Sequence, residues 1–231
     1  MTNDNGRMDV LLACAYVRGH ALRTGTPVLA ESLVQKPLAD LSAAECEQLI
    51  AAGREAELKL YRFKNHENLP RVHKVLGFLR GVYPESLLDV GSGRGVFLFP
   101  LLHEFPGVPV TSVDILPHRV EALGDIHLGG VEELTALEQD ITAWNMPDGS
   151  FDVVTLLEVL EHIPDVESAV RAAVCLARRY VVVTVPSKPD DNPEHIHLLT
   201  KELLTDLFTR AGAQSLRFDG VNGHLFMTAR L

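Results

Sequence analysis

The stretch Leu87-Leu88-Asp89-Val90-Gly91-Ser92-Gly93-Arg94-Gly95 decides the fold. Apolar residues lead into an acid, the acid leads into three glycines, and a helix-like run from Val96 to Glu104 follows. This order predicts a buried strand, a tight turn and the start of a helix. Because glycine has no Cβ, such a turn lets a ligand approach the backbone closely. The sequence therefore predicts a ligand site at this turn.

Two classes of nucleotide cofactor use such turns, and the residues here distinguish between them. A dinucleotide site needs Gly-x-Gly-x-x-Gly, but the third glycine is Gly95, and Val96 stands at the expected position. Like charges about 4 Å apart repel by about 4 kcal/mol at an effective dielectric of about 20, so Asp89 disfavours a pyrophosphate. The same carboxylate suits S-adenosylmethionine, which carries an ammonium and a sulfonium at that end. The stretch resembles the first motif of class I S-adenosylmethionine-dependent methyltransferases, acid-x-Gly-x-Gly-x-Gly.

Composition narrows the class of protein. The chain has 231 residues, of which 46% are hydrophobic, enough for one sizeable core with an appended piece. A net charge of −10 disfavours non-specific binding to nucleic acid or to an anionic membrane. The apolar run from Val10 is broken at Arg18, so we expect neither a secretory signal nor a membrane span. Three cysteines without metal or disulfide spacing favour a reducing cytoplasm; they are Cys14, Cys46 and Cys175.

From Leu87 onward, strand-like and helix-like segments alternate, which predicts a mostly parallel sheet with helices on both faces. Two final strands without a helix between them predict a C-terminal antiparallel hairpin. This α/β pattern resembles the seven-stranded, Rossmann-like methyltransferase fold. The expected strands are 87–90, 109–113, 134–138, 151–157, 180–185, 215–218 and 224–229, and the expected helices are 119–123, 166–177 and 200–211.

Residues 1–80 are expected to form an N-terminal helical extension, and residues 81–231 the S-adenosylmethionine-binding methyltransferase domain. Helices are predicted at 8–23, 42–63 and 69–79, with Ser42 and Glu45 as a capping box. The segment 54–80 has seven basic and three acidic residues, a local charge of +4. It is either a solvated helical face or a substrate lid that attracts an anion. The resemblance favours a lid, because such helices often cover the active site in this family.

Acids stand at four successive strand ends or turns, where open α/β sheets bind ligands. Asp114 lies 19 residues after Gly95, where an acid can accept hydrogen bonds from ribose hydroxyls. Ile115 is placed to pack on the adenine. Asp140 and Ile141 resemble the third family motif, which implies contacts to the adenine amino group and ring. The expected cofactor-binding residues are Asp89, Gly91, Ser92, Gly93, Gly95, Asp114, Ile115, Asp140, Ile141 and Glu158.

The run Leu157-Glu158-Val159-Leu160-Glu161-His162-Ile163-Pro164 resembles the Glu-x-x-Glu-His segment of small-molecule methyltransferases, which lines the methionine portion and the methyl path. Methyl transfer asks little chemistry of the protein, because the sulfonium is already activated. Holding the reacting atoms in line can supply roughly 7–11 kcal/mol. The residues expected to face the acceptor, and to act as catalytic residues, are Glu158, His162, His195 and His197.

A divalent metal is the alternative reading of these residues. If the run after Leu157 meets the segment around His195, carboxylates and imidazoles converge beside the methyl donor, a ligand set for Mg²⁺, Mn²⁺ or Fe²⁺. The arrangement resembles the metal site of Hen1-type RNA 3′-terminal ribose 2′-O-methyltransferases, although the spacing to their later histidine is longer. The rivals are a metal-free pocket with one histidine as base or orienter, and a structural role. The alternative ligands are Glu158, Glu161, His162 and His195.

The sequence thus predicts a cytoplasmic methyltransferase that moves a methyl group from S-adenosylmethionine to an oxygen or nitrogen of a small molecule. One alternative is a metal-dependent RNA ribose methyltransferase of the Hen1 type, with RNA as a less favoured partner. Another is a non-catalytic module that binds S-adenosylmethionine. Asp89 and Val96 argue against an NAD-dependent dehydrogenase. The sequence predicts no membrane partner, and it leaves the acceptor and the oligomeric state open.

Overall fold

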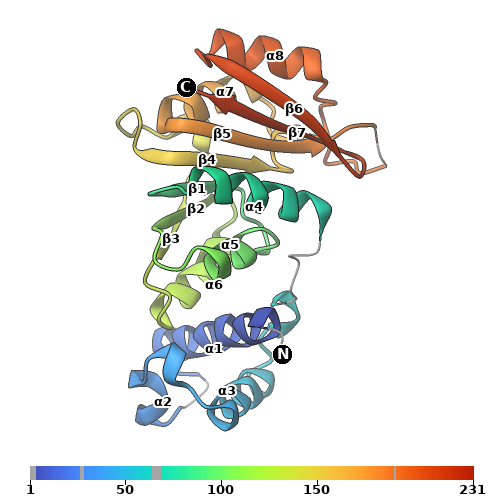
Figure 1. Ribbon diagram of the computed structural model, residues 1–231. Helices are drawn as coiled ribbons and strands as arrows, with labels where there is room; N and C mark the ends of the chain where they lie inside the picture. Colours follow the sequence, from blue (N-terminus) through green and yellow to red (C-terminus); the bar gives the residue numbers. More distant parts are fainter. Residues whose placement is uncertain (1–3, 27–28, 64–68, 190) are drawn as a thin grey trace.

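The computed structural model describes residues 4–26, 29–63, 69–189 and 191–231, and a seven-stranded sheet runs through it (Figure 1). The strand order is β3-β2-β1-β4-β5-β7-β6. Strands β1 to β5 pair in parallel, and β7 is antiparallel to both β5 and β6. The predicted sheet and its terminal hairpin are confirmed. The strands are β1 (Leu87–Val90), β2 (Val110–Asp114), β3 (Leu134–Glu138), β4 (Phe151–Leu157), β5 (Ala177–Pro186), β6 (Ser215–Val221) and β7 (His224–Arg230).

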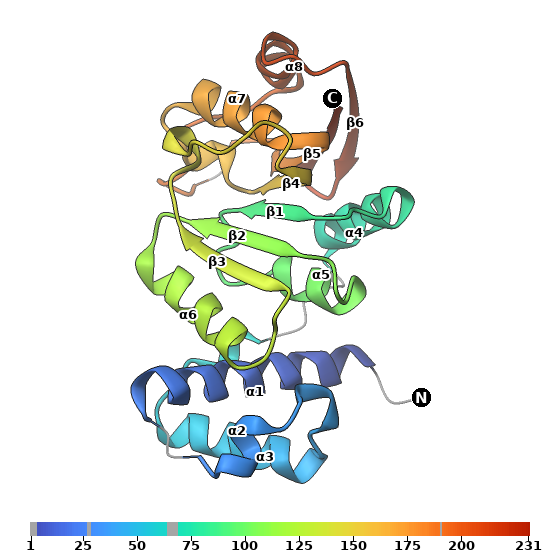
Figure 2. The ribbon, with the colours of Figure 1, turned by 90° about the vertical axis from the view of Figure 1, so that its left-hand side faces the viewer.

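Helices cover both faces of the sheet (Figures 1 and 2). Successive residues of a strand point to opposite faces, and the central strands are apolar at successive positions, so both faces need a cover. Leu87 belongs to the core shared with α4, α5 and α6, whereas Leu88 belongs to the core shared with α7 and α8. The helices are α1 (Asp4–Thr24), α2 (Glu31–Gln35), α3 (Ala43–Glu55), α4 (Pro70–Val82), α5 (Leu98–Glu104), α6 (Pro117–Leu128), α7 (Val166–Leu176) and α8 (Lys201–Arg210).

Helix α3 begins as predicted and ends earlier than predicted. The Ser42 hydroxyl accepts from the backbone N–H of Glu45, and the Glu45 carboxylate accepts from the backbone N–H of Ser42, which completes the capping box. The expected helix over 42–63 was too long. Glu57 has φ of 56°, in the left-handed region, so α3 stops at Glu55 and a 3-10 turn follows at Leu60–Arg62.

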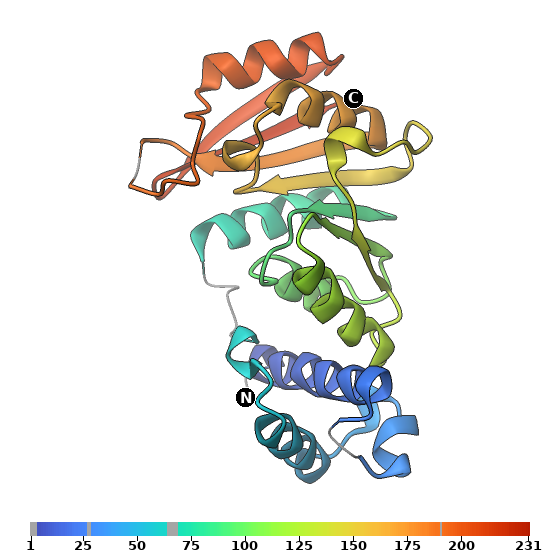
Figure 3. The same cartoon turned by 180° about the vertical axis from the view of Figure 1, so that it is seen from behind.

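Helices α1, α2 and α3 lie at one end of the molecule, where α1 packs along α6 (Figures 2 and 3). Arg23 of α1 binds the buried Asp125 of α6 through two hydrogen bonds of 2.6 and 2.8 Å. The boundary predicted between residues 80 and 81 falls within α4, whose buried residues pack in the same core as Leu87. Within the described part of the chain, no helix is both long and apolar enough to cross a membrane.

Candidate functional site

The glycine turn joins β1 to α5 at the carboxyl edge of the sheet. Gly91 and Gly95 have φ of 66° and 81°, a region that side chains disfavour. A Cβ on Gly91 would lie 2.7 Å from Cγ2 of Val159, and a Cβ on Gly95 would lie 2.4 Å from Cζ of Phe99. Both the backbone conformation and the close packing therefore require glycine at these two positions.

Asp89 lies in a buried hydrogen-bond network beneath this turn. Ser92 Oγ donates to Oδ2 at 2.5 Å, and Thr155 Oγ1 donates to Oδ1 at 2.6 Å. Ser112 Oγ donates in turn to Ser92 Oγ at 2.7 Å. Burial raises the pKa of the Asp89 carboxyl to about 6, although the two hydroxyl hydrogen bonds oppose this rise. Both oxygens thus have partners within the chain, and a contact to the cofactor ammonium stays a prediction.

Asp114 ends β2 and lines a pocket that we call the Asp114 pocket. Its Oδ1 accepts from the Leu116 N–H at 3.0 Å, and its Oδ2 faces Arg119 Nη1 at 3.2 Å. Ile115 is 65% exposed and lines the same pocket, an unusual position for an apolar side chain and one that suits a flat aromatic ligand. The pocket is lined by Gly91, Gly93, Asp114, Ile115, Arg119, Asp140, Ile141, Glu158, His162 and Glu194, among others.

Asp140 and Ile141 line the Asp114 pocket from the end of β3. Asp140 Oδ1 accepts from the N–H and the hydroxyl of Thr142, both at 2.8 Å, and so caps a short 3-10 turn. Ile141 is buried and packs with Val113 in the core on the α7 side of the sheet. The structure therefore brings together the acids and apolar neighbours that the sequence assigned to the adenosine. Their contacts with a cofactor stay predictions.

Glu158 follows β4 and has an unusual backbone, because its φ of 57° is in the left-handed region. Its N–H donates to the Thr184 carbonyl at 2.8 Å. Its Oε2 lies 3.0 Å from Nε2 of His224, the first residue of β7. Sequence reasoning missed His224. The Asn222-Gly223 turn before it was a hairpin signal, but nothing in the sequence pointed to Glu158 as the partner.

The segments around His162 and His195 meet, as the sequence suggested they would. One ligand atom from each of Glu161, His162 and His195 lies within 4.8 Å of the others. The two imidazole centroids are 4.8 Å apart. His162 Nδ1 faces the Glu194 carbonyl at 2.9 Å, and this contact fixes the orientation of the ring. A carboxylate and two imidazoles suit a divalent cation by their chemistry.

Two of the residues predicted to face the acceptor or bind a metal, His197 and Glu158, lie outside the cluster of Glu161, His162 and His195. His197 Nε2 faces the backbone carbonyls of Ile163 and Pro164 at 3.1 and 3.3 Å, so its ring ties two loops together. Glu158 is outside the three-residue ligand cluster. The reason is the left-handed backbone at Glu158, which breaks the helical turn that would have placed Glu158 and Glu161 on one face.

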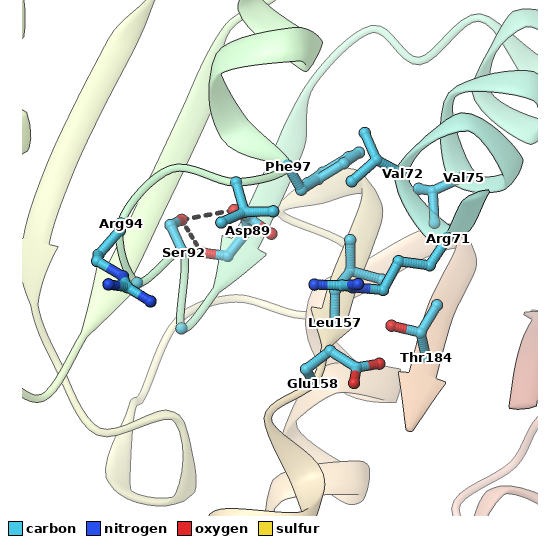
Figure 4. Close-up of a pocket in the computed structure, with 13 residues that line it drawn as sticks. Arg71, Val72, Val75, Asp89, Ser92, Arg94, Phe97, Leu157, Glu158 and Thr184 are labelled. Carbon is cyan, nitrogen blue, oxygen red and sulfur yellow. Dashed lines mark hydrogen bonds between the residues drawn. The ribbon is translucent and has the colours of Figure 1, made fainter. Parts of the chain in front are cut away.

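A second pocket, which we call the α4 pocket, lies on the other side of the glycine turn. Figure 4 shows Arg71 reaching from α4 over Leu157, with Glu158 and Thr184 beside it. Arg71 is half-buried, and it makes no ion pair with any residue in the described ranges. In the sequence, Arg71 stands out only as part of a basic segment. The pocket is lined by Arg71, Val72, Val75, Asp89, Gly91, Ser92, Gly93, Arg94, Val96, Phe97, Leu157, Glu158 and Thr184.

Two other cations of the basic segment bind surface carboxylates. Lys74 pairs with Asp219, and Arg80 pairs with Glu104. Lys64 and Glu67 of this segment lie outside the described residues. The solvated-face interpretation therefore fits Lys74 and Arg80, whereas Arg71 occupies a pocket.

The sequence matches known proteins over most of its length. A family model described as "Methyltransferase domain" matches residues 60–217. The chain belongs to this methyltransferase domain family. It is 32% identical over 149 residues to a ubiquinone biosynthesis O-methyltransferase of Bordetella bronchiseptica, a match that covers 62% of this chain and 59% of the relative. The chain thus matches less than two thirds of that relative's length.

Solved structures support the fold alone, because their sequences are distant. A putative O-methyltransferase of Nostoc punctiforme has a TM-score of 0.59 at 14% identity, over 97% of this chain and 72% of that chain. The methyltransferase domain of a bacterial Hen1 protein has a TM-score of 0.58 at 17% identity, over 70% of this chain and 98% of that chain. These two likenesses do not separate the small-molecule interpretation from the RNA interpretation.

Proposed function

We propose that this protein transfers a methyl group from S-adenosylmethionine to an oxygen of a small-molecule acceptor. The observation that carries the proposal is the Asp114 pocket, where Asp114, Asp140 and Glu158 from three strand ends meet the glycine turn. The similarity to ubiquinone biosynthesis O-methyltransferases supports oxygen over nitrogen as the methylated atom. It also favours a small molecule over the RNA 3′ end of the Hen1-type alternative.

The residues around the turn have separate roles in this proposal. Asp114 accepts hydrogen bonds from the ribose hydroxyls, and Ile115 and Ile141 pack on the adenine. Asp140 accepts a hydrogen bond from the adenine amino group. The methionine portion lies against the backbone of the glycine turn, at Gly91, Ser92, Gly93 and Gly95. The negative charge of Asp89 attracts the ammonium, and hydrogen bonds from Ser92 and Thr155 hold the Asp89 carboxylate in place. The gain in rate comes from holding sulfur, methyl and acceptor in line.

Arg71 binds the carboxylate of the methionine portion in this proposal. It is a half-buried cation on the same pocket wall as the glycine turn, without an ion-pair partner in the described ranges. Arg71→Gln should weaken S-adenosylhomocysteine binding about 10- to 100-fold, the scale of a lost charged hydrogen bond. Binding of 5′-methylthioadenosine, which has no carboxylate, should not change. Calorimetry with both ligands measures this.

Lys74→Gln is the matched control for Arg71→Gln, because it removes a positive charge from the same helix one turn away. Lys74 pairs with Asp219, so its loss should leave both affinities unchanged. Equal weakening of both ligands by Arg71→Gln would remove Arg71 from the carboxylate site. Absence of S-adenosylhomocysteine binding to the unaltered protein would contradict the proposed function itself.

A divalent metal is a second candidate feature, favoured by the convergence of Glu161, His162 and His195. These three residues would hold the ion, with His162 oriented by the Glu194 carbonyl. A bound divalent cation would lower the pKa of an acceptor hydroxyl. In the metal-free alternative, His162 or His195 orients the acceptor or takes its proton. His197 faces carbonyls of the loop, so we do not assign it to the acceptor.

Metal analysis separates these alternatives. A cation bound at one per chain, and lost in His195→Ala, would support the metal site. Activity abolished by EDTA and restored by Mn²⁺, with an RNA 3′ end as acceptor, would support the Hen1-type alternative. Binding of S-adenosylhomocysteine without acceptor-dependent turnover would support a non-catalytic module.

We place the protein in the cytoplasm within the same proposal. The three cysteines form no disulfide, and Cys14 and Cys46 are buried as thiols. This pattern suits a reducing compartment. Fractionation of cells that produce the protein would test this placement.

A further inference from the structure

Three strand ends bring Glu158, Thr184 and His224 together on the α4 side of the sheet. Thr184 of β5 pairs with Leu157 of β4, so Glu158 follows directly beside it. Pro186 of β5 pairs with His224 of β7. The three residues are far apart in the sequence, and only the pairing of β5 with both neighbours makes them adjacent.

Glu158 is held in a strained conformation by this arrangement. A non-glycine residue in the left-handed region is strained, and the strain persists where the surroundings impose it. Here the N–H of Glu158 is fixed by the Thr184 carbonyl, and Oε2 is fixed by His224. The other carboxylate oxygen, Oε1, is buried and has no hydrogen-bond partner among the described residues. The left-handed backbone and these two contacts therefore leave Oε1 available to a further hydrogen-bond donor.

His224 is itself positioned by the turn that precedes it. Its Nδ1 lies 3.2 Å from the Asn222 carbonyl, which leaves Nε2 directed at Glu158. The turn is tied to the end of β5, because the N–H and hydroxyl of Ser187 both donate to the Gly223 carbonyl, at 2.9 and 2.8 Å. The β6–β7 turn thus places the His224 imidazole beside the Glu158 carboxylate.

Thr184 adds a second polar atom to this cluster. The residue is 1% exposed, and its hydroxyl has no hydrogen-bond partner within the described ranges. A buried polar group without a hydrogen bond destabilises the folded state. Thr184 and Glu158 line the α4 pocket together, with Arg71 and Leu157 beside them and apolar Val72 and Val75 farther along the same pocket (Figure 4). A ligand hydroxyl in this part of the α4 pocket would offer these atoms a hydrogen-bond partner.

We propose that Glu158 Oε1 and Thr184 Oγ1 form a subsite for a hydroxyl group of the methyl acceptor, and that His224 is a positioning residue for Glu158. The inference rests on the proposed function and deepens it. A carboxylate oxygen accepts a hydrogen bond, and a threonine hydroxyl donates or accepts one, so the pair recognises O–H. The proposed function places the methionine portion at Arg71 and the glycine turn. The apolar residues Val72, Val75 and Leu157 of the same pocket suit a hydrocarbon ring that bears this hydroxyl.

The test uses the complete chain saturated with S-adenosylhomocysteine. Catechol is the probe, and 1,2-dimethoxybenzene, which has no O–H, is its matched control. Calorimetry should detect catechol binding and no dimethoxybenzene binding. Thr184→Val and His224→Leu should each weaken catechol about threefold to tenfold, the scale of one hydrogen bond. His224→Gln, which keeps a donor near the Nε2 position, should restore the affinity.

Controls separate recognition from folding and from the proposed function. His127→Gln, at an exposed histidine of α6, should change nothing. Thr184→Val should not lower the free energy of unfolding, because its hydroxyl has no partner among the described residues. Thr155→Val should lower it by removing the hydrogen bond to Asp89. Catechol binding that is absent, or that is equal in Thr184→Val, overturns the subsite. Intact S-adenosylhomocysteine binding in that case leaves the proposed function standing.

Discussion

The Asp89 carboxyl makes stability depend on pH in a direction opposite to that of most acids. Its pKa is raised by burial to about 6, from an ordinary value of 3.8. Between these values the folded protein keeps a proton that the unfolded chain has lost, so raising the pH penalises the folded state. Stability from this group is therefore lost as pH rises from about 4 to 6, by up to about 3 kcal/mol, and then stays constant.

Asp89→Asn tests this prediction because an amide does not titrate. Urea unfolding of both proteins at several pH values gives the difference in unfolding free energy, from which the other ionisable groups cancel. We expect the original protein to lose stability relative to Asp89→Asn from pH 4 to 6. A difference that is independent of pH would mean that Asp89 ionises as an ordinary acid.

Asp114 should contribute directly to cofactor affinity. Asp114→Ala should weaken S-adenosylhomocysteine by about 1–3 kcal/mol, because the ribose hydroxyls would lose a charged hydrogen-bond acceptor. Asp148→Ala is the control, at an exposed acid outside both pockets. Calorimetry measures both variants. Equal affinities of Asp114→Ala and the unaltered protein would remove Asp114 from the ribose site.

The site residues that could be predicted from the sequence are those at the ends of recognisable strands. Asp114, Ile115, Asp140 and Ile141 do line one pocket, because successive parallel strands end at the same edge of the sheet. The sequence does not indicate Thr184 and His224, because their position depends on the register of β5 against β7. Neither the charge nor the spacing of these residues reveals which strand pairs with which.

At the scale of the elements, the contact of α1 with α6 depends on glycine. A Cβ on Gly19 would lie 1.7 Å from the Asp125 carbonyl oxygen, whereas a Cβ on Gly77 of α4 would meet nothing within 4 Å. Gly19→Ala should therefore push the helices apart and destabilise the protein by about 3 kcal/mol. Gly77→Ala should stabilise it by about 0.5–1 kcal/mol, because alanine favours a helix. Denaturant unfolding compares them; similar effects of both would contradict this packing.

Helix existence was easier to predict than helix length. The pattern located α3 through its Ser42 cap but extended it to Phe63. The sequence pattern places Leu58 inside the predicted helix. In the structure its N–H donates to the Gly53 carbonyl, five residues back, because Glu57 between them has a left-handed backbone. Leu58 and Leu60 of this turn pack against a buried cluster that we call the N-terminal core, formed by Cys14, Val17, Leu33, Leu41, Cys46 and Leu49. Such tertiary packing ends α3, and local propensity does not encode it.

At the scale of the whole molecule, the N-terminal helices share a core with the sheet. Tyr16 packs on Phe63 with ring centroids 5.5 Å apart, and Phe63 stacks on Phe99 of α5 at 5.2 Å. Leu12 of α1 and Leu87 of β1 belong to one buried cluster. The sequence suggested a separate extension up to residue 80, because it could show a change of pattern but not which surfaces pack together.

This shared core predicts that the two predicted parts, 1–80 and 81–231, unfold together. Trp144 is the one tryptophan of the chain and lies near Phe151, so its fluorescence follows the sheet. Cys14 and Cys46 are buried in the N-terminal core, so their reaction with a thiol reagent follows the helices. In a Cys175→Ser background, which removes the exposed thiol, both signals should change at the same denaturant concentration. Thiols that react well before the fluorescence changes would establish residues 1–80 as an independently unfolding unit, and would overturn the inference that one core joins them to the sheet.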